Sequence, residues 1–116
     1  MGVLTIRVIA ADPVLRNALV RQIERSGRVA VTTVAEPVLD GAGLHDVVVT
    51  TVSDCPPEEC LAMSGRGASV LILTPVPRPR EAEAYAASGA VAYLPMRVDG
   101  SDLIDTISGI VSHHAG

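Results

Sequence analysis

Residues 69–94 decide the fold class, and their sequence is SVLILTPVPRPREAEAYAASGAVAYL. The run Val70–Leu73 is apolar on both faces of an extended chain, as a strand covered by helices on both sides must be. Pro79 opens a helix predicted over Arg80–Ser88, Gly89 ends it, and a second strand is predicted over Ala90–Leu94. Strand, helix and strand in this order predict a parallel βαβ unit.

The same alternation extends in both directions from this unit. The first strand of the unit is predicted over Ser69–Thr74. The strands predicted before the unit are Leu4–Ala10, Val29–Val34 and Asp46–Val52. Further helices are predicted to begin at Asp12-Pro13, at Pro57 and at Ser101. Between Val34 and Asp46, Pro37, Gly41 and Gly43 leave room only for a loop with at most one turn. The sequence predicts one α/β domain over residues 1–116, with its second helix short or missing.

The composition excludes several classes of protein. The chain has 116 residues, of which 48% are hydrophobic, so it can bury a core without disulfides or metals. Its net charge of −4 provides no basic surface for nucleic acid. Its apolar runs are much shorter than the ~20 residues of a membrane span, and the N-terminus carries no secretory signal. We expect a cytoplasmic domain without membrane contact and without direct nucleic acid contact.

The cysteines and histidines do not predict a metal site. Cys55 and Cys60 are five residues apart, and the histidines are His45, His113 and His114. Zinc sites require closer pairs, such as CxxC or HxxxH, with matching partners. We therefore predict no metal and no cofactor.

Four motifs carry a resemblance to a known family. They are Val70–Thr74, the run ASGAVAYL over Ala87–Leu94, the run DLIDTI over Asp102–Ile107, and Ile6–Arg16. In these motifs the chain resembles the receiver domains of bacterial response regulators, especially the NarL type that precedes a DNA-binding helix-turn-helix. The resemblance implies a flavodoxin-like (CheY-like) three-layer sandwich, with a five-stranded parallel sheet of order 2-1-3-4-5. It also implies that the parent protein regulates transcription.

The resemblance implies a phosphorylation site that this chain has lost. In the family, an acid pair after the first strand helps hold Mg²⁺, an aspartate ending the third strand accepts the phosphoryl group, and a Thr/Ser and a Lys bind its oxygens. The acid pair corresponds to Ala10 and Ala11, the acceptor to Thr51, and the lysine to Met96. Only Thr74 and the switch aromatic Tyr93 match the family. The chain contains no lysine, because all nine of its basic residues are arginine.

Asp12 and Asp54 are the two aspartates close enough in sequence to replace the lost acids. Asp12 is predicted to cap the following helix, and Asp54 is predicted to be a solvated turn residue. We therefore predict a pseudo-receiver that is not an enzyme and that acts through protein contacts. One alternative is a pseudo-receiver that senses a small molecule in the vacated pocket, and another is a phosphorylation-competent receiver with rearranged acids.

In the family, the fourth helix, fifth strand and fifth helix carry dimerisation and effector contacts. The resemblance places this surface on Arg80, Glu81, Glu83, Tyr85, Arg97, Asp99 and Asp102. We expect a homodimer and, where the parent protein has one, contact with a DNA-binding effector domain. The proline-rich segment Pro75–Arg80 is either a plain rigid connector or a loop frozen in one state.

Overall fold

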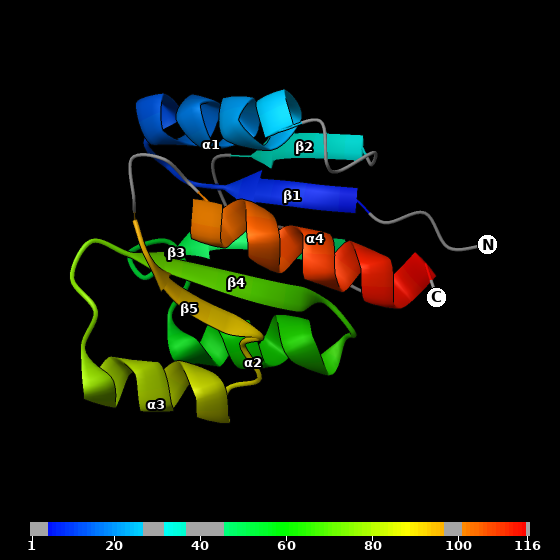
Figure 1. The fold of residues 1–116 in the computed structure, drawn as a ribbon. Coiled ribbons are helices and arrows are strands. Elements are labelled where there is room, and N and C mark those ends of the chain that lie inside the picture. The colour runs from blue at the N-terminus through cyan, green and yellow to red at the C-terminus, as the bar shows by residue number, and fades with distance from the viewer. Residues whose placement is uncertain (1–4, 27–31, 37–45, 97–100, 116) are drawn as a thin grey trace.

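The computed structural model describes residues 5–26, 32–36, 46–96 and 101–115 (Figure 1). In chain order the elements are β1 (Thr5–Ile9), α1 (Pro13–Ser26), β2 (Thr32–Glu36), β3 (Asp46–Thr51), α2 (Pro57–Gly65), β4 (Ser69–Thr74), α3 (Pro79–Ala87), β5 (Ala92–Pro95) and α4 (Ser101–Ala115). The strands form one parallel sheet of order β2-β1-β3-β4-β5. The predicted fold class and strand order are confirmed.

Two strands, β2 and β5, differ from their predicted bounds by two residues or more at one or both ends. β2 begins at Thr32 and ends at Glu36, because its pairing with β1 runs from Thr5 opposite Thr32 to Ile9 opposite Glu36. β5 begins two residues later than predicted, since Ala90 still donates its N–H to the carbonyl of Tyr85 in the turn after α3. The loop predicted between Val34 and Asp46 falls mostly on residues 37–45, which lie outside the described residues.

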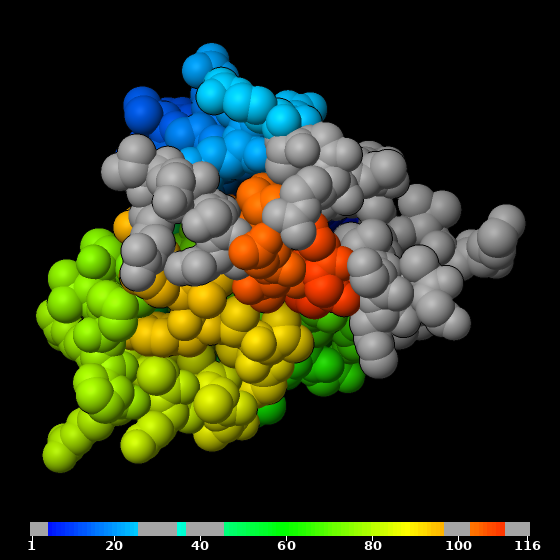
Figure 2. Space-filling model, in the orientation of Figure 1, coloured from blue at the N-terminus to red at the C-terminus, as the bar shows by residue number. Residues whose placement is uncertain are grey.

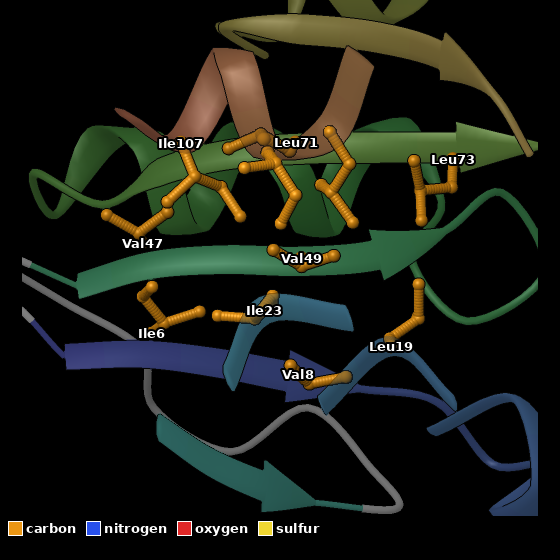
Figure 3. Close-up of a cluster of buried hydrophobic side chains, with 11 residues drawn as sticks. Ile6, Val8, Leu19, Ile23, Val47, Val49, Leu71, Leu73 and Ile107 are labelled. Atoms are coloured by element: carbon orange, nitrogen blue, oxygen red, sulfur yellow. The ribbon is translucent and has the colours of Figure 1, made fainter. Parts of the chain in front are cut away.

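Helices cover both faces of the sheet. α1 and α4 lie on one face, and α2 and α3 lie on the other (Figure 1). On the first face, alternate residues of the central strands pack against both helices (Figure 3). The strand and helix side chains of this apolar cluster are Ile6, Val8, Leu19, Ile23, Val47, Val49, Leu71, Leu73, Leu103, Ile104 and Ile107.

The intervening strand residues point to the opposite face and form a second apolar cluster. Its members are Ile9, Val48, Cys55, Cys60, Met63, Ala68, Val70, Ile72 and Tyr85. Because both faces of β3 and β4 are buried, their sequences are apolar at consecutive positions and not at alternate ones. None of the helices in the described ranges is long and apolar enough to cross a membrane.

Local contacts fix where helices begin and end. The side chain of Asp12 accepts a hydrogen bond of 2.9 Å from the N–H of Val14, which confirms the predicted cap of α1. After α3, Gly89 adopts a φ of +89°, and a Cβ at this position would lie 2.4 Å from Oγ of Ser64. Gly89 thus permits both the left-handed turn and the close approach of α2.

Candidate functional site

The predicted pocket residues lie at the carboxyl edge of the sheet. Thr51 and Thr74 end β3 and β4, while Ala10 and Met96 follow β1 and β5 directly. Because all strands are parallel, their carboxyl ends meet at one edge, where open α/β sheets place their sites. Met96 is anchored there by its N–H, which donates to the carbonyl of Thr74 at 2.9 Å. The structure therefore brings the strand ends together as predicted.

Asp54 joins two of these strand ends. Its Oδ1 accepts a hydrogen bond of 3.0 Å from the N–H of Ala11, and its Oδ2 accepts one of 2.6 Å from the hydroxyl of Thr51. The N–H of Asp54 donates back to Oγ1 of Thr51 at 3.2 Å. The prediction of a solvated turn aspartate is wrong, because Asp54 is half-buried and holds the β1–α1 connection against the end of β3.

A guanidinium group lies beside the same loop. Nη1 of Arg16, in the first turn of α1, donates to the carbonyl of Ala10 at 2.7 Å. The N–H of Ala10 donates to the carbonyl of Glu36 at 3.1 Å. Both backbone polar groups of Ala10 are therefore occupied by protein partners, and its side chain is a methyl group.

These residues do not fit Mg²⁺, which binds through several oxygen ligands, usually including one or two carboxylates. Ala10 and Ala11, where the resemblance predicts the acid pair, have no carboxylate, and both oxygens of Asp54 accept protein hydrogen bonds. Across the described ranges, no group of three His, Cys, Asp or Glu residues is placed to hold a metal ion. The side chain of Met96, at the predicted lysine position, packs against the apolar cluster that includes residues of α4.

Thr74 and Tyr93, the two positions that match the family, meet at Glu81. Oγ1 of Thr74 lies 3.4 Å from Oε1 of Glu81, and the Tyr93 hydroxyl donates to the same oxygen. The Tyr93 hydroxyl also accepts a hydrogen bond of 3.0 Å from the N–H of Arg78. These contacts connect the ends of β4 and β5 to the first turn of α3.

The predicted interface residues separate into two groups. Arg80 and Glu83 are exposed on α3, and α3, β5 and α4 contribute to one face of the molecule (Figure 2). Glu81 is half-buried and bonds inward, as described above. Arg97 and Asp99 lie outside the described residues, and nothing of the Asp102 side chain is described.

Tyr85 is buried, so the prediction that it belongs to the interface surface is wrong. Its side chain is 2% exposed, and its hydroxyl donates to the carbonyl of Cys55 at 2.6 Å. Tyr85 follows Glu81 by four residues and therefore lies on the same inward face of α3. Burial raises the pKa of Tyr85 to about 12.

An open pocket of about 220 Å³ lies beside Thr74. It is lined by Val52, Thr74, Pro75, Val76, Arg78 and Glu81. Of the residues predicted to line a vacated pocket, only Thr74 borders it. The remaining lining residues are Val52, directly after β3, Glu81 in the first turn of α3, and residues of the β4–α3 connection.

Sequence reasoning missed the roles of Asp54, Arg16 and Glu81. The spacing Thr51-x-x-Asp54 was one available signal, because a hydroxyl and a carboxylate three residues apart close a turn on themselves. For Arg16 and Glu81 the sequence offers no comparable signal. Their partners come from other elements of the fold.

No family model and no curated protein matches the sequence. Solved structures do match in shape. The BeF3-activated receiver domain of DrrB, a Thermotoga maritima response regulator, superposes with a TM-score of 0.76 at 13% identity, covering 96% of this chain and 99% of that one. The receiver domain of the Mycobacterium tuberculosis response regulator NarL gives 0.75 at 16% identity, with 97% and 98% covered.

The ChxR receiver domain from Chlamydia trachomatis gives a TM-score of 0.69 at 18% identity, covering 97% of this chain and 100% of that one. At such identities the likeness shows the fold alone. This chain has the fold of response-regulator receiver domains along nearly its whole length.

Proposed function

We propose that this chain is a pseudo-receiver, a signalling domain that acts through protein contacts and takes up no phosphoryl group. The observation that carries the proposal is the environment of Asp54. In place of an acid pair and an acceptor aspartate, the site contains alanine methyls, the Thr51 hydroxyl and one carboxylate that already accepts hydrogen bonds from the β1–α1 connection and from the end of β3.

The chemistry of aspartyl phosphorylation explains why this matters. Phosphoryl transfer requires a free nucleophile and a cation that neutralises the charge of the transferred group. The Thr51 side chain is 3% exposed and is hydrogen-bonded to Asp54, so it is neither a free nor an accessible nucleophile. With no lysine in the chain, the second cationic group of the family site is also missing.

The proposal is tested by incubating the purified chain with acetyl phosphate and Mg²⁺ and measuring its intact mass. We expect no covalent gain, and no saturable spectral change with Mg²⁺ and beryllofluoride. A mass gain of one phosphoryl group would refute the proposal. If the gain were lost in Asp54→Asn, the result would support the alternative of a receiver with rearranged acids.

We further propose that the face formed by α3, β5 and α4 mediates contact with a second copy and, in a transcription regulator of the NarL type, with a DNA-binding effector domain. Exposed Arg80 and Glu83 give this face charges of both signs. Sedimentation over a range of concentrations should show a dimer that the charge reversals Arg80→Glu and Glu83→Arg weaken. A monomer at all concentrations would contradict the self-association.

The pocket beside Thr74 favours a second candidate function, the sensing of a neutral or apolar small molecule. Val52, Pro75 and Val76 supply apolar walls, and Thr74 supplies a hydroxyl. Arg78 and Glu81 also line the pocket, and their opposite charges leave it without a net charge. A thermal-shift screen with neutral metabolites should then find a stabilising compound whose effect is reduced in Val76→Asp. Equal stabilisation of both proteins would argue against this pocket.

A further inference from the structure

Three elements of the fold converge on the side chain of Glu81. Its Oε1 accepts from the hydroxyl of Tyr93 on β5 and lies 3.4 Å from Oγ1 of Thr74 at the end of β4. Glu81 itself lies in the first turn of α3. One carboxylate oxygen thus connects two neighbouring strands to the helix between them in sequence.

The position of Glu81 suits this role. A carboxylate in the first turn of a helix is stabilised by the positive end of the helix dipole. Hydrogen bonds to a charged acceptor are also about twice as strong as those between neutral groups. The half-buried setting of Glu81 shields these bonds from competing water.

The connection between β4 and α3 is held at both of its ends. At the first end, Oγ1 of Thr74 accepts from the N–H of Val76 at 3.3 Å and lies 3.1 Å from the carbonyl of the same residue. At the other end, the N–H of Arg78 donates to the Tyr93 hydroxyl. Prolines within the segment restrict the backbone between these two points.

The tyrosine rings extend this network toward the Asp54 side of the site. Tyr93 stacks on Tyr85 with ring centroids 6.0 Å apart and planes inclined by 27°. The Tyr85 hydroxyl donates to the carbonyl of Cys55, the residue after Asp54. A movement of Tyr93 away from Glu81 would therefore break its contacts with Glu81, with the N–H of Arg78 and with the Tyr85 ring together.

We propose that Glu81 is a built-in latch, whose carboxylate holds Tyr93 and, through the Tyr93 hydroxyl, the 75–78 connection in a single arrangement. The latch rests on the proposed function, in which Thr51 remains unmodified. It deepens that function because it keeps the α3–β5 surface in one conformation. A partner then meets the same surface at all times, without a phosphoryl group to select it. Of the two alternatives for the proline-rich segment, the latch corresponds to the loop frozen in one state.

The amide of Arg78 provides a direct test, because its acceptor is Tyr93 and not Glu81. Hydrogen exchange at this amide is measured by NMR in the full chain, in Glu81→Ala and in Glu24→Ala. Glu24 is an exposed glutamate on α1, outside the proposed contact face, so the control makes the same charge change. We expect protection of the Arg78 amide to fall by about tenfold or more in Glu81→Ala and to stay unchanged in Glu24→Ala.

Tyrosine emission gives a second readout, since Tyr85 and Tyr93 are the only aromatic residues of the chain. Emission from Tyr93, isolated in Tyr85→Phe, should rise when Glu81 is also replaced, because a bound carboxylate quenches a phenol. Should Glu81→Ala fail to fold, Glu81→Gln keeps the shape without the charge and should lower protection severalfold.

Unchanged Arg78 protection in the folded Glu81 variants would overturn the latch, as would an equal loss in Glu24→Ala. These readouts are independent of the phosphorylation assay. A mass gain with acetyl phosphate would remove the proposed function and leave the Arg78 measurement untouched, so the two failures are distinguishable.

Discussion

Replacing Asp54 with alanine tests whether the carboxyl edge of the sheet is held by this one side chain. The substitution removes the acceptor of the Ala11 N–H and of the Thr51 hydroxyl. A hydrogen bond to a charged group contributes ~1.5–3 kcal/mol, and the exposed Ala11 bond belongs at or below the low end of that range. The buried Thr51 hydroxyl would also lose its acceptor, so we expect the free energy of unfolding to fall by about 2–3 kcal/mol in total.

A double-mutant cycle separates the Thr51–Asp54 bond from other effects of the substitution. Thr51→Val removes the hydroxyl and keeps the shape of the side chain. In wild type it should be destabilising, whereas in Asp54→Ala it should be neutral or stabilising, because it then removes a buried hydroxyl that has lost its acceptor. We expect a coupling energy of about 1–2 kcal/mol between the two positions.

The measurement is urea unfolding of the four proteins of the cycle, with Glu24→Ala as a matched loss of an exposed carboxylate. The control should stay within ~0.5 kcal/mol of wild type. A change of about 2–3 kcal/mol corresponds to roughly 10 °C in Tm for a domain of this size. If Asp54→Ala unfolded within ~0.5 kcal/mol of wild type, or if Thr51→Val cost the same in both backgrounds, the structural role of Asp54 would be refuted.

Other consequences are measurable with the same unfolding assay. Gly89→Ala should destabilise the fold by about 2 kcal/mol or more, because alanine is strained at positive φ and its Cβ would meet Ser64. Gly109→Ala in α4 has open space around its Cβ and should stabilise the fold by ~0.5–1 kcal/mol. Equal effects of the two substitutions would contradict the described surroundings of Gly89. Asp12→Ala should cost ~1 kcal/mol and Asp12→Asn much less, since asparagine still caps, so similar losses would argue against capping. Burial raises the pKa of Cys55 from 9.0 to about 12. Between these pH values the thiol ionises in the unfolded chain but not in the folded one, so the contribution of the buried thiol to the free energy of unfolding is complete below pH 9.0 and is lost as the pH rises toward 12. Cys55→Ala should therefore lose less stability than wild type between these pH values, and parallel losses would count against this explanation.

The fold could be predicted because its central strands are buried on both faces. Runs such as Val47–Val49 and Val70–Leu73 are compatible with few other environments, and the β4 bounds were predicted correctly. β2 was misplaced because apolar character alone set its predicted bounds. Its observed bounds follow from pairing with β1, a contact between segments that the local sequence does not encode.

The candidate site could be predicted only in part. Strand ends such as Thr51 and Thr74 follow from topology, because parallel strands bring their carboxyl ends to one edge. Asp54 and Glu81 were assigned to the surface because charged residues in turns and helix starts are usually solvated. Ala11, the second partner of Asp54, and Tyr93, the partner of Glu81, belong to other parts of the fold, so only the folded chain reveals these two contacts.

The two carboxylates give the absence of lysine a structural context. A site that loses acids and a cation together would be left with backbone and hydroxyl groups that need new partners at the edge of a buried sheet. Here Asp54 takes the Ala11 N–H and the Thr51 hydroxyl, while Arg16 takes the Ala10 carbonyl. On the other side Glu81 takes the Tyr93 hydroxyl. Because these partners come from within the chain, these polar groups are already hydrogen-bonded, and an aspartate in place of Thr51 would break the Asp54 bond and put two carboxylates side by side with no added cation.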